Sequence, residues 1–237
     1  MKQPRGFGVF YDLVIPQLVQ HGDLRRILEV GIGGGGSHFM WSKNFPDARV
    51  VGIDPLLPDV DNNSRKGGLS GTMGALQQLA KFKLNMQINI DFLFADGLAE
   101  STIQQLQRNY GDFDLIVFDA TDYQHENFLR VVELYAPLLS SRGLLVNELP
   151  GIRGWKVRAQ EILQTPDPQI ARWQAQINQG CVIYNFDGIS THVEQEETHP
   201  GHWRDNRIAV YKNPVYESLN TQELDQFIWR PEHEASS

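Results

Sequence analysis

Glycines and carboxylates stand together at the ends of two apolar segments early in this 237-residue sequence. The array Glu29-x-Gly31-x-Gly33-x-Gly35 closes the first segment, and Asp54 closes the second. Glycines in a strand-to-helix turn permit positive φ and let the backbone approach a ligand closely. A carboxylate at the end of the second strand reaches the hydroxyls of a bound ribose. The pattern therefore predicts a site for a nucleoside-containing ligand.

The acidic residue that leads the array separates it from the dinucleotide-binding pattern, in which a pyrophosphate lies at a helix N-terminus. Glu29 instead favours a ligand with a charged amino-acid moiety, whose cation a carboxylate attracts. The alternative is a glycine-rich turn that binds nothing.

Apolar runs and helical spacing alternate along the first two-thirds of the chain. We expect an N-terminal helix that kinks at Pro16, a polar loop over 58–71, and a turn at Ser141–Gly143. Five strand–helix alternations are typical of a doubly wound, Rossmann-like α/β sheet with helices on both faces. The strands are expected at 25–31, 48–55, 88–96, 113–120 and 143–149, and the helices at 9–22, 36–45, 72–84, 99–109 and 125–139.

The alternation weakens after Gly151. Helices are expected at 153–164 and 169–178, and strands at 181–187 and 207–213 as a late antiparallel pair that closes the sheet edge. The histidine-containing loop between these strands has no compact zinc-ligand spacing and is interpreted as a lid or surface loop. Residues 227–237 are expected to fray. We predict one domain over 1–237, with a helical segment at 1–24, a cofactor-binding core at 25–150, and completion of the sheet and lid at 151–237.

Composition narrows the class of protein. The net charge of −8 and a pI near 5.3 argue against binding to nucleic-acid phosphates. No basic run suggests a membrane surface, and no apolar run is long enough for a signal peptide or a membrane span. The single cysteine, Cys181, is compatible with a reducing compartment. A cytoplasmic protein is expected.

The glycine array, the segment "GGGGSHFMWSKNFPDARVVGIDP" and the strand "FDLIVFD" resemble class I S-adenosylmethionine-dependent methyltransferases over about residues 25–150. The resemblance is nearest to macrolide-sugar O-methyltransferases of the macrocin and mycinamicin type. It implies S-adenosylmethionine as cofactor, with Asp54 on the ribose hydroxyls and Asp96 on the adenine amino group. The cofactor-binding residues implied are Glu29, Gly31, Gly33, Gly35, Asp54, Asp96 and Asp119.

Asp119 and Glu148 end the fourth and fifth expected strands, where two adjacent carboxylates suit a hard cation. The macrolide-sugar enzymes use magnesium at the equivalent strand ends. This chain departs from their pattern, since Ala120, Tyr123 and Leu149 replace an Asp, a His and an Asp. Asp119 and Glu148 are thus candidate metal ligands, and the sequence leaves open whether this chain binds magnesium.

An aliphatic or sugar hydroxyl needs a general base, whereas a carboxylate acceptor does not. His125 is the best histidine near a strand end, with Tyr123 and Asp122 as rivals and a solvated helix start as the alternative for His125. The candidate catalytic residues are Asp119, His125 and Tyr123.

The expected function is methylation of a small, natural-product-like molecule at oxygen, without nucleic-acid or membrane partners. The resemblance also implies a homo-oligomer. Asp119 and Asp122 keep the Asp-x-x-Asp spacing of spermidine-synthase-like aminopropyltransferases, which use decarboxylated S-adenosylmethionine. A non-catalytic cofactor-binding protein is a further alternative. An NAD dehydrogenase is disfavoured because no catalytic dyad follows the glycines.

Overall fold

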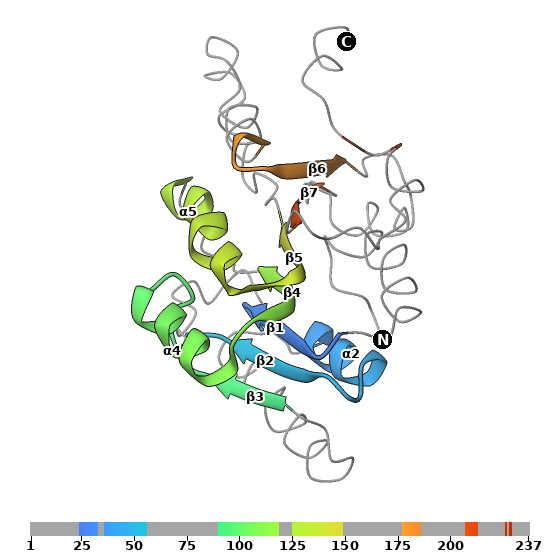
Figure 1. Ribbon diagram of the computed structural model, residues 1–237, viewed down its shortest axis with the longest axis vertical. Helices are drawn as coiled ribbons and strands as arrows, with labels where there is room; N and C mark the ends of the chain where they lie inside the picture. The colour runs from blue at the N-terminus through green and yellow to red at the C-terminus, as the bar shows by residue number, and fades with distance from the viewer. Residues whose placement is uncertain are drawn as a thin grey trace, which may run out of the picture.

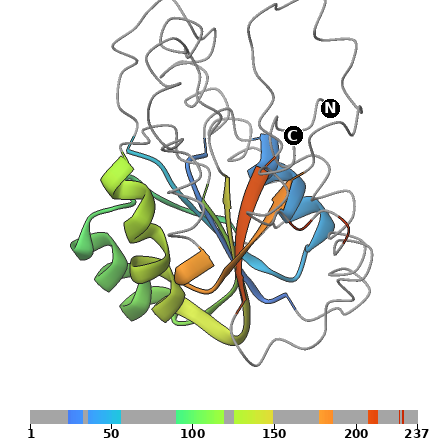
Figure 2. The same cartoon turned by 90° about the horizontal axis from the view of Figure 1, so that it is seen from above.

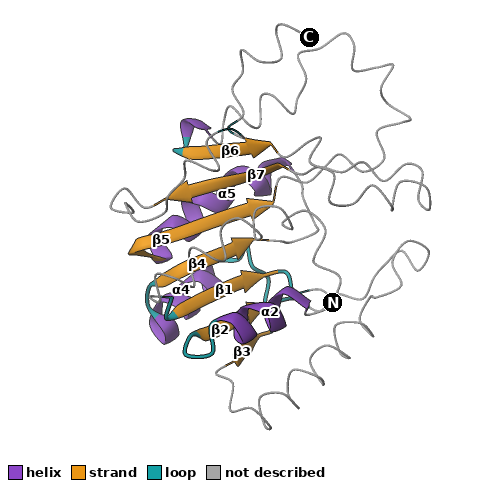
Figure 3. Cartoon of the chain, turned by 90° about the vertical axis from the view of Figure 1, so that its right-hand side faces the viewer, coloured by secondary structure: helices purple, strands orange, loops and turns teal. Residues whose placement is uncertain are grey.

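A seven-stranded sheet organises the protein in the computed structural model (Figure 1). The structure describes residues 24–32, 36–55, 90–118, 125–148, 177–185 and 207–212, together with Gln226 and Ile228. The strand order is β3-β2-β1-β4-β5-β7-β6, which Figure 3 shows from the side.

The first five strands run parallel, and described helices follow β1, β3 and β4. The chain moves outward from β1 to β3 and then crosses back to β4, so the sheet reverses its direction of winding between β1 and β4. The elements are β1 (Arg26–Val30), α2 (Gly36–Asn44), β2 (Arg49–Ile53), β3 (Ile90–Leu93), α4 (Glu100–Tyr110), β4 (Phe113–Phe118), α5 (His125–Tyr135), the 3-10 turn η1 (Ala136–Leu138), β5 (Leu139–Glu148), β6 (Cys181–Asn185) and β7 (Arg207–Lys212).

Helices cover both faces of the sheet, as Figure 2 shows. On one face Trp41 of α2 and Phe45, the residue after that helix, pack with Ile27 of β1. On the other face, Leu106 of α4 and Tyr135 of α5 pack in a cluster with strand residues such as Leu28 and Ile116. The parallel strands are apolar on both sides because both faces are buried. The predicted doubly wound fold is confirmed.

The late antiparallel strands are confirmed as well. β7 pairs antiparallel with both β5 and β6, so strands from the last third of the chain complete the sheet. Ile228 forms an antiparallel bridge with Tyr184 and packs against the α2-side core. The prediction of a frayed end is therefore wrong at Ile228, because this apolar residue is partly buried beside the edge strand β6.

The strand β5 begins earlier than predicted. Residues Ser141–Gly143 were expected to form a turn, yet they lie within the strand, and Leu139 pairs with Phe113. The register of the β4–β5 pair shifts between Phe113 and Leu115, which is the mark of a bulge. Ser140 Oγ donates a hydrogen bond to Asp114 Oδ1 over 2.8 Å beside this shift. The tertiary pairing thus overrides the turn-forming residues.

Several predicted segments lie outside the described residues. They are the helices at 9–22, 72–84 and 153–164, nearly all of the helix at 169–178, and the loops at 58–71 and 190–203. Within the part of the chain that the structure describes, no helix is long and apolar enough to cross a membrane.

The bulge gives a stability prediction. A Cβ on Gly143 would lie 2.7 Å from the backbone oxygen of Phe113, which cannot move aside without disrupting the β4–β5 pair. We expect Gly143→Ala to lower the free energy of unfolding by about 1–3 kcal/mol in urea denaturation. The exposed neighbour Ser141 supplies the control, since Ser141→Ala should change it by less than about 0.5 kcal/mol. Equal effects of both changes would contradict this account of the bulge.

Candidate functional site

The carboxyl ends of β1, β2 and β3 are joined by backbone hydrogen bonds. The Gly31 N–H donates to the Ile53 carbonyl over 2.8 Å, and the Asp54 N–H donates to the Leu93 carbonyl over 3.3 Å. These bonds align the carboxyl ends of β1, β2 and β3. The aligned ends lie beside the point between β1 and β4 where the sheet reverses its direction of winding. Open α/β sheets place their ligands at this edge.

Gly31 has φ 90°, a conformation that side chains disfavour. The first glycine of the array therefore serves a backbone need, because β1 must turn sharply at its end. Gly33 and Gly35 lie outside the described residues, and their predicted roles stay predictions.

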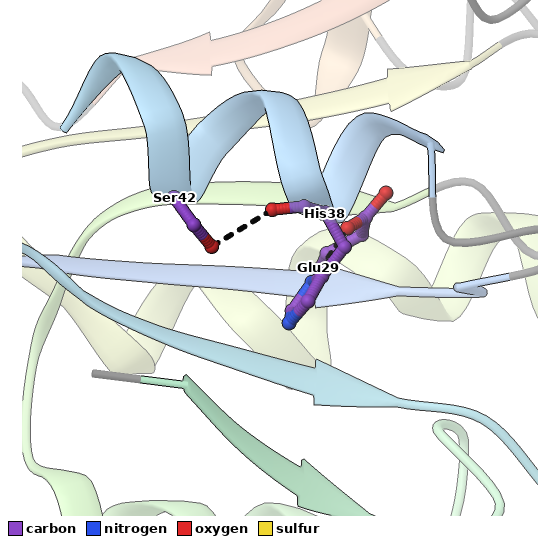
Figure 4. Close-up of polar contacts among 3 residues, drawn as sticks. All are labelled: Glu29, His38 and Ser42. Carbon is purple, nitrogen blue, oxygen red and sulfur yellow. Dashed lines mark hydrogen bonds and ion pairs between the residues drawn. The ribbon is translucent and has the colours of Figure 1, made fainter. Parts of the chain in front are cut away.

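Glu29 is the one acidic residue on β1, and its side chain is fully buried. Its Oε2 lies 2.8 Å from Nδ1 of His38, which is fully buried in the first turn of α2 (Figure 4). A buried hydrogen bond therefore joins the His38 ring to the Glu29 carboxyl group. Ser42 Oγ donates to the His38 carbonyl over 3.0 Å one turn later.

The His38 ring lies over β2 and the edge strand β3. A Cβ on Gly52 would lie 2.9 Å from its Cε1, and the ring centroid is 5.2 Å from that of Phe92. Among the described residues, His38 Nε2 has no hydrogen-bond partner. Only a glycine at position 52 leaves room for the imidazole, so this close approach constrains β2 as well as α2.

The predicted adenine-binding residue Asp96 lies in a turn between β3 and α4. Its Oδ1 accepts a hydrogen bond from the Leu98 N–H over 2.9 Å, and its carbonyl accepts one from the Ala99 N–H over 3.2 Å. Asp96 is solvent-exposed and Asp54 is half-buried. Phe94, just before this turn, is 58% exposed and is the one large exposed hydrophobic residue among those described.

The turn that carries Asp96 is anchored from the helix side. Tyr135 of α5 donates its hydroxyl to the Gly97 carbonyl over 2.5 Å, and a Cβ on Gly97 would lie 2.5 Å from Val30 Cγ1. Burial, together with the nearby Asp96 carboxylate, raises the pKa of Tyr135 well above its usual value. The hydroxyl thus keeps its proton and remains a donor.

The other predicted site residues are placed less fully. Asp119 and Tyr123 lie outside the described residues, β4 ending at Phe118. His125 begins α5 and Glu148 ends β5 opposite Ile208 of β7, but only their backbones are described. The described residues contain no group of three or more His, Cys, Asp or Glu side chains suited to a metal ion. The catalytic and metal roles therefore stay predictions.

Sequence reasoning missed the role of His38 as the partner of Glu29. The signal was the inward stripe His38, Trp41, Ser42 and Phe45, which has the spacing of one helix face and is buried throughout. Sequence reasoning also missed Tyr135, which is far from Gly97 in the chain and carries no local signal.

No protein-family model matches the sequence, and no curated protein matches it. The fold is similar to that of a proposed caffeoyl-CoA O-methyltransferase from Staphylococcus aureus, with TM-score 0.52 and 18% identity over 89% of this chain and 83% of that one. The N-methyltransferase NodS from Bradyrhizobium japonicum WM9 aligns with TM-score 0.49 and 17% identity over 87% of this chain and 96% of its own.

MycE, a methyltransferase of the mycinamycin biosynthetic pathway solved with Mg and SAH, aligns with TM-score 0.49 and 18% identity. That alignment covers 88% of this chain and 50% of MycE. The strand order and the similarity to the Staphylococcus aureus protein show a Rossmann-like fold of the kind found in methyltransferases, so the resemblance found in the sequence is confirmed at the level of fold.

The support for the Asp96 turn is testable. We expect Tyr135→Phe to lower the free energy of unfolding by about 1–2 kcal/mol, because the ring is retained while the Gly97 carbonyl loses its buried donor. Urea denaturation measures this. Tyr110→Phe is the control, since no hydrogen bond of its hydroxyl is described, and its effect should stay below about 0.5 kcal/mol. A Tyr135 variant as stable as the Tyr110 variant would refute the anchoring role.

Proposed function

We propose that this chain is an S-adenosylmethionine-dependent methyltransferase that acts on a small molecule at oxygen. One observation carries the proposal: Gly31, Asp54 and Asp96 stand at the carboxyl ends of three neighbouring parallel strands that backbone hydrogen bonds hold together. Fold alone does not define a reaction, so the proposal rests on these residues at this edge.

The described residues fit the nucleoside part of this cofactor. Asp54 would accept hydrogen bonds from the ribose hydroxyls, and Asp96 would accept one from the adenine amino group. Phe94, exposed between these two carboxylates in the chain, offers an aromatic face on which a flat base can stack. The positive φ of Gly31 lets the chain turn away and leave space above the strand ends.

Bound S-adenosylmethionine supplies an electrophilic methyl carbon on a sulfonium. In the proposed reaction the acceptor oxygen would bond to that carbon as the carbon–sulfur bond breaks, and the sulfur would keep the electron pair. The contribution of this chain is to orient the two reactants and to take the proton of a hydroxyl acceptor. His125 is our candidate base, Tyr123 and Asp122 are its rivals, and Asp119 would help to position the reactants.

The acceptor proposed is a small, natural-product-like molecule, with no nucleic acid and no membrane as partner. The net charge of −8 supports this choice because phosphate backbones would be repelled. We further propose one domain over 1–237, a homo-oligomer and a cytoplasmic location. Asp119 and Glu148 would be the ligands if magnesium takes part, since both offer hard oxygen atoms.

The ribose contact gives a direct test. We expect Asp54→Ala to weaken S-adenosylmethionine binding by at least about tenfold in calorimetric titration, because hydrogen bonds to a charged acceptor are lost. Asp47→Ala is the control. It removes an exposed carboxylate just before the amino end of β2, opposite to the carboxyl end that carries Asp54, and it should leave the affinity unchanged. Unchanged affinity in the Asp54 variant would remove the basis of the proposal.

The identity of the cofactor is tested by titrating the protein with S-adenosylmethionine and with its decarboxylated form, each with and without magnesium. We expect the intact cofactor to bind more tightly by at least about tenfold, the size of one ionic contact. Asp119→Ala should lose methyl transfer while it keeps most of that affinity. Tighter binding of the decarboxylated form would instead favour an aminopropyltransferase. Binding of S-adenosylmethionine without methylation of any acceptor would favour the non-catalytic alternative.

A further inference from the structure

The turn between β3 and α4 is held by three hydrogen bonds. Asp96 Oδ1 accepts one from the Leu98 N–H over 2.9 Å, so this oxygen is directed toward the backbone of the turn. The Asp96 carbonyl accepts a second from the Ala99 N–H over 3.2 Å. Tyr135 donates the third to the carbonyl of Gly97 over 2.5 Å. Asp96 is solvent-exposed, and its Oδ2 has no hydrogen-bond partner among the described residues. One carboxylate oxygen is therefore available to a ligand.

The Tyr135 side chain is itself held in one place. It is fully buried in the core cluster beneath α4 and α5, and its ring lies edge-on to that of Phe118, with 5.6 Å between the centroids. A Cβ on Gly97 would lie 3.2 Å from the Tyr135 hydroxyl oxygen and 2.5 Å from Val30 Cγ1. The turn is thus packed between the end of β1 and a hydroxyl whose position the core fixes.

A carboxylate oxygen in a fixed position can discriminate between bases. The 6-amino group of adenine donates a hydrogen bond to it, whereas the 6-oxo group of hypoxanthine is an acceptor and has no proton to offer. Two facing acceptors leave polar groups unpaired, which costs binding free energy. This discrimination depends on the supports of the carboxylate, because a turn that can shift would move the oxygen away from an unsuitable base.

We propose that Tyr135 is a positioning residue for base selection. By holding the Gly97 carbonyl, its hydroxyl keeps Asp96 Oδ2 directed at the base and makes the site prefer adenine to hypoxanthine. The inference rests on the proposed function, in which Asp96 meets the adenine amino group. Tyr135 acts through the turn, since its own side chain is fully buried and belongs to the helix layer. Its hydroxyl thus contributes selectivity in addition to stability.

The test compares S-adenosylhomocysteine with S-inosylhomocysteine, in which a 6-oxo group replaces the 6-amino group of the base. The dissociation constant of the inosyl compound divided by that of the adenosyl compound, both measured by calorimetry, isolates base selection from recognition of the rest of the ligand. A partial loss of folding would weaken both ligands alike and leave this ratio unchanged. We expect a ratio of at least about ten for the wild-type protein.

We expect Tyr135→Phe to reduce the ratio by at least about threefold, because the packing of the ring is retained while the turn is released. Gly143→Ala is the matched control. It is expected to destabilise the protein to a similar extent, but it acts beside Phe113 at the amino end of β4, so it should leave the ratio unchanged.

Asp96→Asn tests the orientation of the carboxylate without altering Tyr135. Only the amide oxygen of an asparagine can accept the Leu98 N–H, so the amide nitrogen would take the place of Oδ2 and donate to the 6-oxo group. We expect the ratio to fall below one. Adding Tyr135→Phe to this variant should bring the ratio back to about one, because the released turn no longer directs either group at the base.

An unchanged ratio in Tyr135→Phe would overturn the inference, because the hydroxyl would then serve stability alone. If that variant fails to fold, an Asp96→Asn ratio of one or more would overturn it instead. A wild-type protein that binds both ligands equally would do the same. Failure of the proposed function is a different result, in which the wild-type protein binds neither ligand, and the inference falls with it.

Discussion

A carboxylate buried at the end of the first strand constrains everything around it. Glu29 cannot remain inside the protein without a polar partner, and one such partner, His38, belongs to the next helix. That contact joins α2 to β1, beside the packing of Trp41 with Ile27 and Val50. It also demands glycine at position 52, because any Cβ there would meet the imidazole and Ile32.

Close packing also constrains the turn that follows β3. Gly97 leaves no space for a side chain beside Val30, and Tyr135 reaches from α5 to bind its carbonyl. The turn that presents Asp96 is thereby packed against β1 and bonded to the helix layer. Rigid secondary structure on both sides thus supports the two carboxylates that the proposed cofactor needs. Pre-organisation of this kind lowers the entropic cost of binding.

The strands that carry the proposed cofactor contacts and those that carry the proposed catalytic residues come from different parts of the chain. β1 to β3 carry the proposed nucleoside contacts, whereas β4 and β5 lead into Asp119 and Glu148. The crossing between β1 and β4 leaves the carboxyl ends of all five parallel strands at one edge of the sheet. A cofactor held over the first set would thus lie beside the residues proposed to meet the acceptor, which is the arrangement that transfer between two bound molecules requires.

The sequence alone determined the fold class, the parallel core and the antiparallel edge strands, because each follows from a local apolar run or a local turn signal. It also identified Glu29, Gly31, Asp54 and Asp96 as residues at strand ends. Only the tertiary structure decided that Glu29 pairs with His38, that Tyr135 anchors Gly97, and that Ile228 returns to the sheet. The early start of β5 was likewise decided by its partner strand. These contacts join residues whose meeting depends on helix orientation, strand register and close packing, and no local pattern encodes those three quantities.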